Sequence, residues 1–175
     1  MINLRKVVLY IAMSLDGYMA GKDDDLSFLN DFDSLSLVHT SYEALINQID
    51  TILLGRKTYD WIKAHSAWPY QGLKTIVFSS KPQSIEEGVM TDESPKTIVS
   101  HLKNEVGKDI WLIGGGRFVQ SCLDDDLIDE MIIAITPHLL GEGTKLFSTH
   151  QKQFSLTNVQ HEKDLVLLSY ERKKV

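Results

Sequence analysis

The stretch Asp109-Ile-Trp-Leu-Ile-Gly-Gly-Gly-Arg-Phe118 decides the fold that this sequence predicts. Its apolar run stops at three consecutive glycines and resumes as Phe118-Val-Gln120, which is typical of a strand, a tight turn and a helix. Glycine tolerates positive φ and has no Cβ, so such a turn can approach an anion closely, and the helix start offers unpaired N–H groups. Arg117 adds a positive charge there. The alternative is that the glycines only make a sharp connection, and the motif by itself leaves both interpretations open.

Two other strand ends carry similar chemistry. The segment Thr51-Ile-Leu-Leu-Gly-Arg-Lys-Thr-Tyr-Asp60 places one glycine, two cations and a hydroxyl after a β-branched run. In Lys74–Pro82, the apolar run is followed by Ser79, Ser80 and Lys81. Ligands of open α/β sheets bind at the carboxyl ends of strands, so these ends predict a site for an anionic ligand. A dinucleotide with a pyrophosphate and an extra 2′-phosphate needs contacts of this kind, and Arg and Lys suit the 2′-phosphate.

Along the chain, apolar β-type runs alternate with helix-like segments, which is typical of an α/β domain with crossover helices. The predicted strands are Lys6–Ser14, Thr51–Leu54, Thr75–Ser79, Gly88–Met90, Ile110–Ile113, Asp129–Thr136 and Leu165–Arg172. The predicted helices are Leu37–Gln48, Thr58–Ala64, Ile98–Glu105 and Arg117–Leu123. The length of 175 residues predicts a single domain, residues 1–175, which buries about 70% of the surface that its unfolded chain exposes.

Composition argues against several other classes of function. A net charge of −6 disfavours a nucleic-acid surface, and Val7–Met13 is too short to span a membrane and is expected to be a core strand. Cys122 is the single cysteine, so it is expected to be a buried apolar residue in a protein of the reducing cytoplasm. The acidic triplets Asp23–Asp25 and Asp124–Asp126 lack the alternating ligands of a calcium loop, and the histidines are scattered. We therefore expect solvated turns at both triplets and no metal site.

Five motifs, in this order, resemble the dihydrofolate reductase superfamily. They are Ser14-Leu-Asp-Gly-Tyr-Met-Ala20, Gly55-Arg-Lys-Thr58, Phe78-Ser-Ser80, Ile113-Gly-Gly-Gly-Arg117, and Ile128-Asp-Glu130 leading to Pro137-His-Leu-Leu-Gly-Glu-Gly143. From Val7 to Tyr170 the sequence most resembles the C-terminal reductase domain of riboflavin-pathway deaminase-reductases and their stand-alone relatives. The resemblance implies a three-layer αβα dihydrofolate reductase-like fold that binds NADPH, with a mixed, mainly parallel central sheet and a C-terminal antiparallel hairpin.

The motifs and the resemblance together predict the ligand sites. The cofactor-binding residues are expected to be Ala20, Gly21, Gly55, Arg56, Lys57, Thr58, Ser79, Ser80, Lys81, Ile113, Gly114, Gly115, Gly116, Arg117 and Phe118. The substrate pocket is expected to contain Trp61, Trp68 and Phe28, whereas Trp111 lies within a predicted strand and is expected in the core.

A reductase that acts on an imine or carbonyl also needs a proton donor. Asp16 is the first candidate because it ends the first strand, beside the segment Tyr18–Gly21 that in the resembled family lies against the nicotinamide. The competing interpretation is that Asp16 caps the turn before Gly17 through an Asx-type hydrogen bond. Further candidates are Asp31, Asp33 and Glu142.

The resemblance implies an NADPH-dependent reductase that transfers a hydride to a heterocyclic small molecule. The nearest named activity is 5-amino-6-(5-phosphoribosylamino)uracil reductase of riboflavin biosynthesis, and a cytoplasmic homodimer is implied. Asp24–Asp31 lacks the Trp-x-x-Pro-x-Asp/Glu element typical of dihydrofolate reductases, and Tyr59–Lys63 lacks the Asp-Asp-Pro element typical of riboflavin-pathway reductases. No His-x-Glu and Pro-Cys-x-x-Cys pair is present, which excludes zinc-dependent deamination. Reduction of dihydrofolate or another pterin, and a non-catalytic module that binds or senses a nucleotide, are the alternatives.

Overall fold

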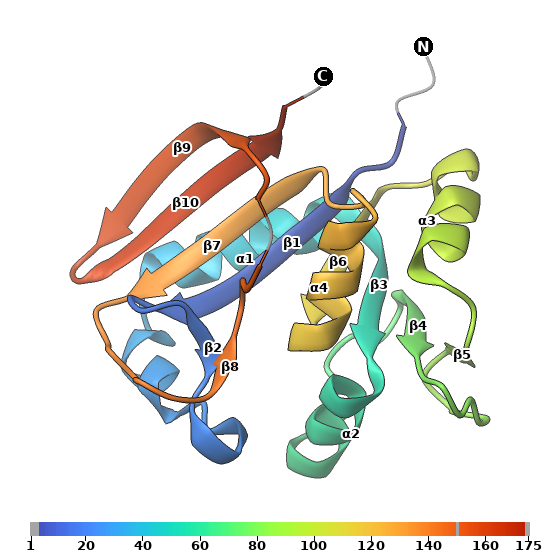
Figure 1. Ribbon diagram of the computed structural model, residues 1–175, viewed down its shortest axis with the longest axis horizontal. Coiled ribbons are helices and arrows are strands. Elements are labelled where there is room, and N and C mark those ends of the chain that lie inside the picture. The colour runs from blue at the N-terminus through green and yellow to red at the C-terminus, as the bar shows by residue number, and fades with distance from the viewer. Residues whose placement is uncertain (1–3, 150, 174–175) are drawn as a thin grey trace.

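In the computed structural model, which describes residues 4–149 and 151–173, a central sheet of eight strands has the order β5-β4-β3-β6-β1-β7-β10-β9 (Figure 1). The strands are β1 (Val7–Ser14), β3 (Ile49–Gly55), β4 (Lys74–Phe78), β5 (Val89–Thr91), β6 (Asp109–Gly114), β7 (Glu130–Thr136), β9 (Phe154–Glu162) and β10 (Leu165–Arg172). Neighbours from β5 to β7 are parallel, and β10 runs antiparallel to both β7 and β9. The predicted mixed sheet with a C-terminal antiparallel hairpin is confirmed.

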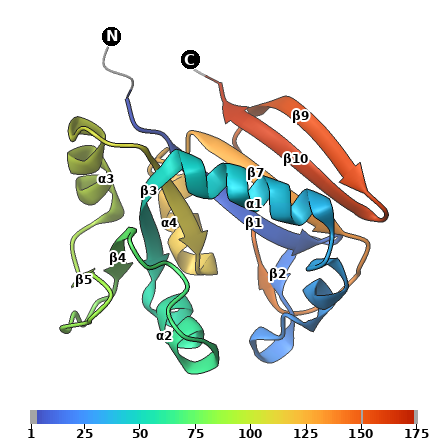
Figure 2. The ribbon, with the colours of Figure 1, turned by 180° about the vertical axis from the view of Figure 1, so that it is seen from behind.

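Helices cover both faces of this sheet. They are α1 (Ser36–Gln48), α2 (Arg56–His65), α3 (Pro95–Asn104) and α4 (Gly116–Asp124). On β1, Leu9 belongs to the same buried cluster as Val119 of α4, and its neighbour Val8 belongs to the cluster that contains Leu45 of α1. Because successive strand residues point to opposite faces, α1 and α4 lie on opposite sides of the sheet, as the two views of Figures 1 and 2 show. These are the three layers that the sequence predicts.

A small second sheet and an edge strand were not predicted. β2 (Tyr18–Ala20) pairs antiparallel with β8 (Thr144–Lys145), and two 3₁₀ helices, η1 (Lys22–Asp24) and η2 (Ser27–Phe32), connect β2 to α1. The small strands are too short to show a period. The edge strand β9 is mostly exposed and polar, so it lacks the apolar run that marks the buried strands. The β2–β8 pair matters for the site because it closes the carboxyl edge of the sheet beside β1 and β6.

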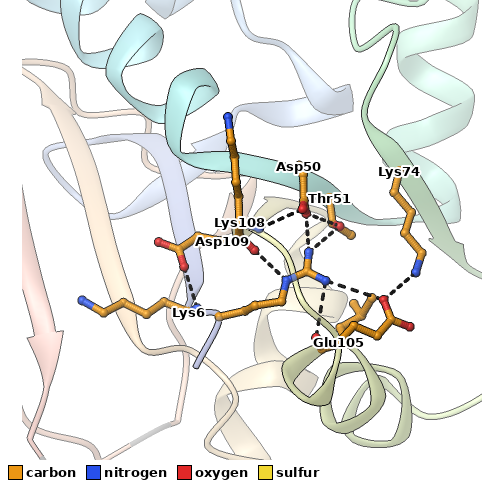
Figure 3. A network of polar contacts seen from close by, with 9 residues as sticks. Lys6, Asp50, Thr51, Lys74, Glu105, Lys108 and Asp109 are labelled. Atoms are coloured by element: carbon orange, nitrogen blue, oxygen red, sulfur yellow. Dashed lines mark hydrogen bonds and ion pairs between the residues drawn. The ribbon is translucent and has the colours of Figure 1, made fainter. Parts of the chain in front are cut away.

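Arg5 ties together the opposite, amino-terminal edge of the sheet. Figure 3 shows its partners Asp50, Thr51 and Lys108 gathered there. The buried guanidinium of Arg5 donates to the Lys108 carbonyl at 2.6 Å, to the Thr51 hydroxyl at 2.7 Å and to the Asp50 carboxylate. Asp50 also accepts from the Lys108 backbone N–H at 2.8 Å. The network therefore holds the starts of β1, β3 and β6 in register. It lies at the opposite end of these strands from their carboxyl ends.

No helix in the described part of the chain is both long and apolar enough to cross a membrane.

Candidate functional site

A cavity of about 280 Å³ opens at the carboxyl-terminal halves of β1 and β6, between β2, β8 and α2. Its walls are mainly apolar and come from several separate segments. The residues that line it are Ile11, Ala12, Met19, Ala20, Asp24, Leu26, Leu29, Lys57, Thr58, Trp61, Ile62, Tyr70, Ile113, Gly115, Gly116 and Thr144. This is the sheet edge where ligands of open α/β folds bind.

The structure brings part of the predicted cofactor site together at this cavity. The predicted residues that line it are Ala20, Lys57, Thr58, Ile113, Gly115 and Gly116. The predicted residues that do not line it are Gly21, Gly55, Arg56, Ser79, Ser80, Lys81, Gly114, Arg117 and Phe118. Phe118 packs in the core instead, stacked on Phe78 with ring centroids 4.6 Å apart, because it faces inward from the first turn of α4.

Two helix starts lie side by side at the cavity. α2 begins after Gly55 and α4 after Gly115, and neither N-cap residue makes a side-chain capping bond. Their first turns reach the cavity through Thr58 and Gly116. The first N–H groups of a helix have no intrahelical partner and carry the positive end of the dipole, so both starts favour an anion at this place.

Gly115 allows this close approach. Its φ is +95°, where L side chains rarely lie, and a Cβ placed on it would be 3.2 Å from the Thr58 hydroxyl oxygen. Glycine is therefore required both for the turn and for the contact between the starts of α2 and α4.

Arg56 and Ser79–Lys81 lie along the same edge, at the carboxyl ends of β3 and β4, whereas Arg117 is exposed in the first turn of α4. Arg56 donates to both carboxylate oxygens of Asp60 at 2.8 Å, and its guanidinium reaches the Met90 sulfur on β5 at 3.4 Å. Ser79 follows β4 and accepts a hydrogen bond from the backbone N–H of Lys81 at 3.1 Å. Arg56 and Ser79–Lys81 thus form a second polar group on the β4 side, separate from the cavity.

Asp24 was not predicted as a site residue. The sequence interpretation treated Asp23–Asp25 as a solvated turn, but Asp24 lines the cavity and its carboxylate lies 2.9 Å from the Lys57 ammonium. No pattern in the sequence predicts this ion pair, because its two residues belong to segments distant in sequence, the segment after β2 and the first turn of α2.

The three aromatic residues predicted for the substrate pocket occupy different places. Trp61 lines the cavity at its rim and stacks on His65 at 4.2 Å. Trp68 does not line it and packs behind Tyr70, with ring centroids 5.3 Å apart, since the loop after α2 folds back on the core. Phe28 does not line it either, because η2 turns its ring inward, where it is buried against His138.

A second, smaller cavity of about 110 Å³ adjoins the first, sharing Ile11, Ala12 and Leu29 with it. It lies between α1, η2, β1, β7 and β10. Its other lining residues are Tyr10, Phe32, Asp33, Leu37, Val38, Ser41, Ala134, Thr136, Leu165 and Leu167. The walls are again mostly apolar, with a small set of polar groups of the kind that orient a small ligand.

The polar groups of this second cavity are a carboxylate and three hydroxyls. Asp33 follows η2, and no group in the described part of the chain bonds to its carboxylate. The Tyr10 hydroxyl lies 2.8 Å from the Ser41 hydroxyl, and burial raises the pKa of Tyr10, so this phenol stays protonated at neutral pH. Asp33 is thus the acidic residue that this cavity presents to a ligand.

Asp16 lies outside both cavities. Its carboxylate accepts from the Ser14 hydroxyl at 2.6 Å and from the backbone N–H groups of Leu140 and Gly141 at 3.1 and 2.8 Å. The bond from Ser14, followed by those two N–H groups, lowers the pKa of Asp16 to about 2. This geometry favours a turn-shaping role, because all of these bonds hold the carboxylate within the turn after β1 and the loop at Leu140–Gly141. The Tyr18 backbone N–H donates to the Ser14 hydroxyl at 3.0 Å and not to Asp16, so the turn is closed by Ser14 and not by an Asx-type bond.

Two other acidic candidates, Asp31 and Glu142, also lie outside both cavities. Asp31 is exposed on η2 and lines neither cavity, and Glu142 is an exposed partner of Lys22 at 3.9 Å. Within the described residues, no group of three or more His, Cys, Asp or Glu side chains is placed to hold a metal ion.

Known proteins resemble the chain over nearly its whole length. The chain is 35% identical over 173 residues to the uncharacterized protein YwjB of Bacillus subtilis, covering 96% of this chain and 98% of that protein. A putative riboflavin biosynthesis protein from Shewanella sp. PV-4 superposes with a TM-score of 0.86 at 29% identity, covering 97% and 99% of the two chains. Dihydrofolate reductase from Enterococcus faecalis, complexed with NADP(H) and RAB-propyl, shares the fold with a TM-score of 0.71 at 13% identity, covering 97% of each chain.

The fold is therefore dihydrofolate reductase-like. The family model described as the RibD C-terminal domain matches residues 5–166, which is nearly the whole chain. This protein belongs to the RibD C-terminal domain family.

Proposed function

We propose that the protein is an NADPH-dependent reductase that transfers a hydride to a heterocyclic small molecule. The observation that carries the proposal is the pair of adjoining cavities with a common wall at Ile11, Ala12 and Leu29. One cavity adjoins two helix starts that suit phosphates, and the other, whose walls are mostly apolar, is lined by the exposed carboxylate of Asp33. Hydride transfer requires donor and acceptor rings in contact, and adjoining cavities provide that proximity.

The residues at the larger cavity fit a dinucleotide. Thr58, Gly115 and Gly116 would hold the pyrophosphate at the starts of α2 and α4, with Lys57 beside them. Arg56 and Ser79–Lys81, farther along the same edge, would hold the 2′-phosphate. The NADP(H) bound to the structurally similar dihydrofolate reductase supports this choice of cofactor.

The cofactor supplies the hydride. The protein orients the reacting rings, excludes water from them and supplies a proton. The apolar walls of both cavities exclude water from the reacting rings. In this proposal Asp33 is the proton donor to the acceptor in the smaller cavity, because it is the acidic residue that lines that cavity. Asp16 keeps the turn after β1 in place and does not donate.

Binding of the two nicotinamide cofactors tests the cofactor assignment. We expect NADPH to bind more tightly than NADH, and we expect Arg56→Ala to cost about 1.5–3 kcal/mol of NADPH binding free energy, because a charge-assisted contact is lost. The binding free energy of NADH, which lacks the 2′-phosphate, should change much less in this variant. Titration calorimetry with both cofactors measures the difference, and Lys96→Ala, which removes an exposed cation from α3, is the control. Equal affinity of the parent protein for both cofactors contradicts the assignment.

Gly115→Ala tests the turn between β6 and α4. Alanine at this position, where φ is +95°, strains the backbone in the free protein. Its Cβ would lie close to Thr58 and would also block a phosphate from the turn. We expect NADPH affinity to fall at least about tenfold and the free energy of unfolding to fall by about 1–3 kcal/mol. Urea denaturation and NADPH titration measure the two effects. Gly72→Ala is the control, because Gly72 has a φ of +84° with nothing near a new Cβ, and it should lose stability without losing NADPH affinity.

Turnover decides between the reductase and its alternatives. The family description and the riboflavin biosynthesis protein of similar structure favour an aminopyrimidine acceptor, with 5-amino-6-(5-phosphoribosylamino)uracil reduction as the nearest named activity. Oxidation of NADPH should be followed with aminopyrimidine ribosides, pterins and small carbonyl compounds. Turnover of a pterin alone would favour a pterin reductase, and tight NADPH binding without turnover would favour a sensing module. The homodimer and the cytoplasmic location stay predictions.

A further inference from the structure

Asp24 and Lys57 meet across the larger cavity. The Asp24 carboxylate lies 2.9 Å from the Lys57 ammonium, and both residues line the cavity. Asp24 ends η1, after β2, whereas Lys57 belongs to the first turn of α2, and both views of the fold place these segments at the same end of the molecule (Figures 1 and 2). The contact therefore pairs a cation of the first turn of α2 that lines the cavity.

The backbone around Asp24 is shaped for this contact. Asp23 and Asp24 have φ values of +56° and +61°, a conformation that few residues other than glycine, asparagine and aspartate adopt. Hydrogen bonds from the Gly21 N–H to the Asp25 carbonyl at 2.8 Å and from the Asp25 N–H to the Lys22 carbonyl at 3.1 Å close the turn. This tight turn directs the Asp24 carboxylate toward α2.

We propose that Asp24 is an affinity-setting residue, an internal competitor that a ligand's phosphate must displace from Lys57. The inference rests on the proposed function, because it takes the ligand of the larger cavity to be a dinucleotide. A carboxylate on an ammonium group beside an uncapped helix start is the same kind of contact as a phosphate oxygen at that place. Asp24 thus lowers the affinity for the dinucleotide and keeps Lys57 paired in the free protein.

The exchange is feasible because the pair is exposed. The Lys57 side chain is 77% exposed and that of Asp24 is 39% exposed, so water and salt weaken their attraction. A pyrophosphate brings more negative charge than one carboxylate and also accepts from the free N–H groups of α2 and α4. NADPH and NADH both carry the pyrophosphate, so Asp24 acts on both cofactors equally, unlike Arg56.

Asp24→Asn is the test. Asparagine has the same shape and accepts positive φ, so the turn persists while the competing charge is lost. We expect the dissociation constants of NADPH and NADH to fall by about three- to tenfold each at low salt, and the gain to shrink as ionic strength rises. Asp23→Asn is the matched control, because Asp23 is the adjacent residue, also has positive φ, and does not line the cavity. It should change both constants by less than about twofold.

The origin of the gain is tested in a Lys57→Met background. There Asp24→Asn should leave both dissociation constants nearly unchanged, because the group for which the carboxylate competes is absent. Unchanged or weaker binding by Asp24→Asn, an equal gain from Asp23→Asn, or a gain that survives in Lys57→Met overturns the inference while leaving the reductase proposal intact. A parent protein that binds neither cofactor overturns the proposed function and this inference together.

Discussion

Replacing Asp33 with Asn is expected to lower turnover of the heterocyclic acceptor by about 10²–10⁴, while NADPH affinity stays within about twofold of the parent value. Asp33 lines the smaller cavity and does not line the larger one, so its loss should act on the acceptor and spare the cofactor. Asparagine keeps the shape of the side chain but has no acidic proton. Steady-state turnover and calorimetric NADPH titration measure the two quantities on the same preparation.

Two matched variants separate proton donation from other effects of the change. Asp31→Asn alters an exposed carboxylate in η2, two residues before Asp33, and Asp16→Asn alters the carboxylate that holds the turn after β1; both should keep nearly full turnover. The rate of Asp33→Asn should rise as the pH is lowered, because solvent then supplies the missing proton. A full-rate Asp33→Asn variant, or a large loss in Asp16→Asn alone, would assign the donor elsewhere.

The fold was largely predictable from the sequence because its central strands are buried on both faces. Such strands appear as continuous apolar runs, and β1, β3, β4 and β6 all show one. The glycines at the ends of β3 and β6 mark where α2 and α4 begin, so both helix starts of the site were also predictable. β9 shows no such run, since most of its residues face solvent at the edge of the sheet.

The walls of the site were less predictable because they come from segments distant in sequence. Asp24 reaches the larger cavity only through consecutive residues at positive φ, and a triplet of aspartates does not specify that turn. The sequence could not distinguish Asp33 from the other acidic candidates, because its place depends on how η2 lies beside β1 and β7 at the smaller cavity. Conversely, Phe118 comes two residues after the last glycine of the motif, yet it packs in the core, because the first turn of α4 directs it away from the cavity. Local pattern identifies strand ends, whereas tertiary packing selects which side chains face a ligand.

Arg5→Met is expected to lower the free energy of unfolding by about 2–4 kcal/mol, because it leaves the buried acceptors of the guanidinium without a donor, at about 1–3 kcal/mol for each unsatisfied group. The Arg5 side chain is only 3% exposed and donates to the Thr51 hydroxyl, the Lys108 and Leu102 carbonyls and the Asp50 carboxylate (Figure 3). Methionine fills much of the same volume but satisfies none of these acceptors. Chemical denaturation with urea measures the loss.

The position of Arg5 predicts that its effect on ligand binding is small. The network lies at the amino-terminal ends of β1, β3 and β6, whereas both cavities lie toward the carboxyl-terminal ends, so NADPH affinity of the folded variant should stay near the parent value. Lys6→Met is the matched control: its side chain is 46% exposed, and exposed ion pairs contribute only about 0–1 kcal/mol. A loss for Arg5→Met no greater than that for Lys6→Met would mean that the buried guanidinium does not hold the sheet edge together.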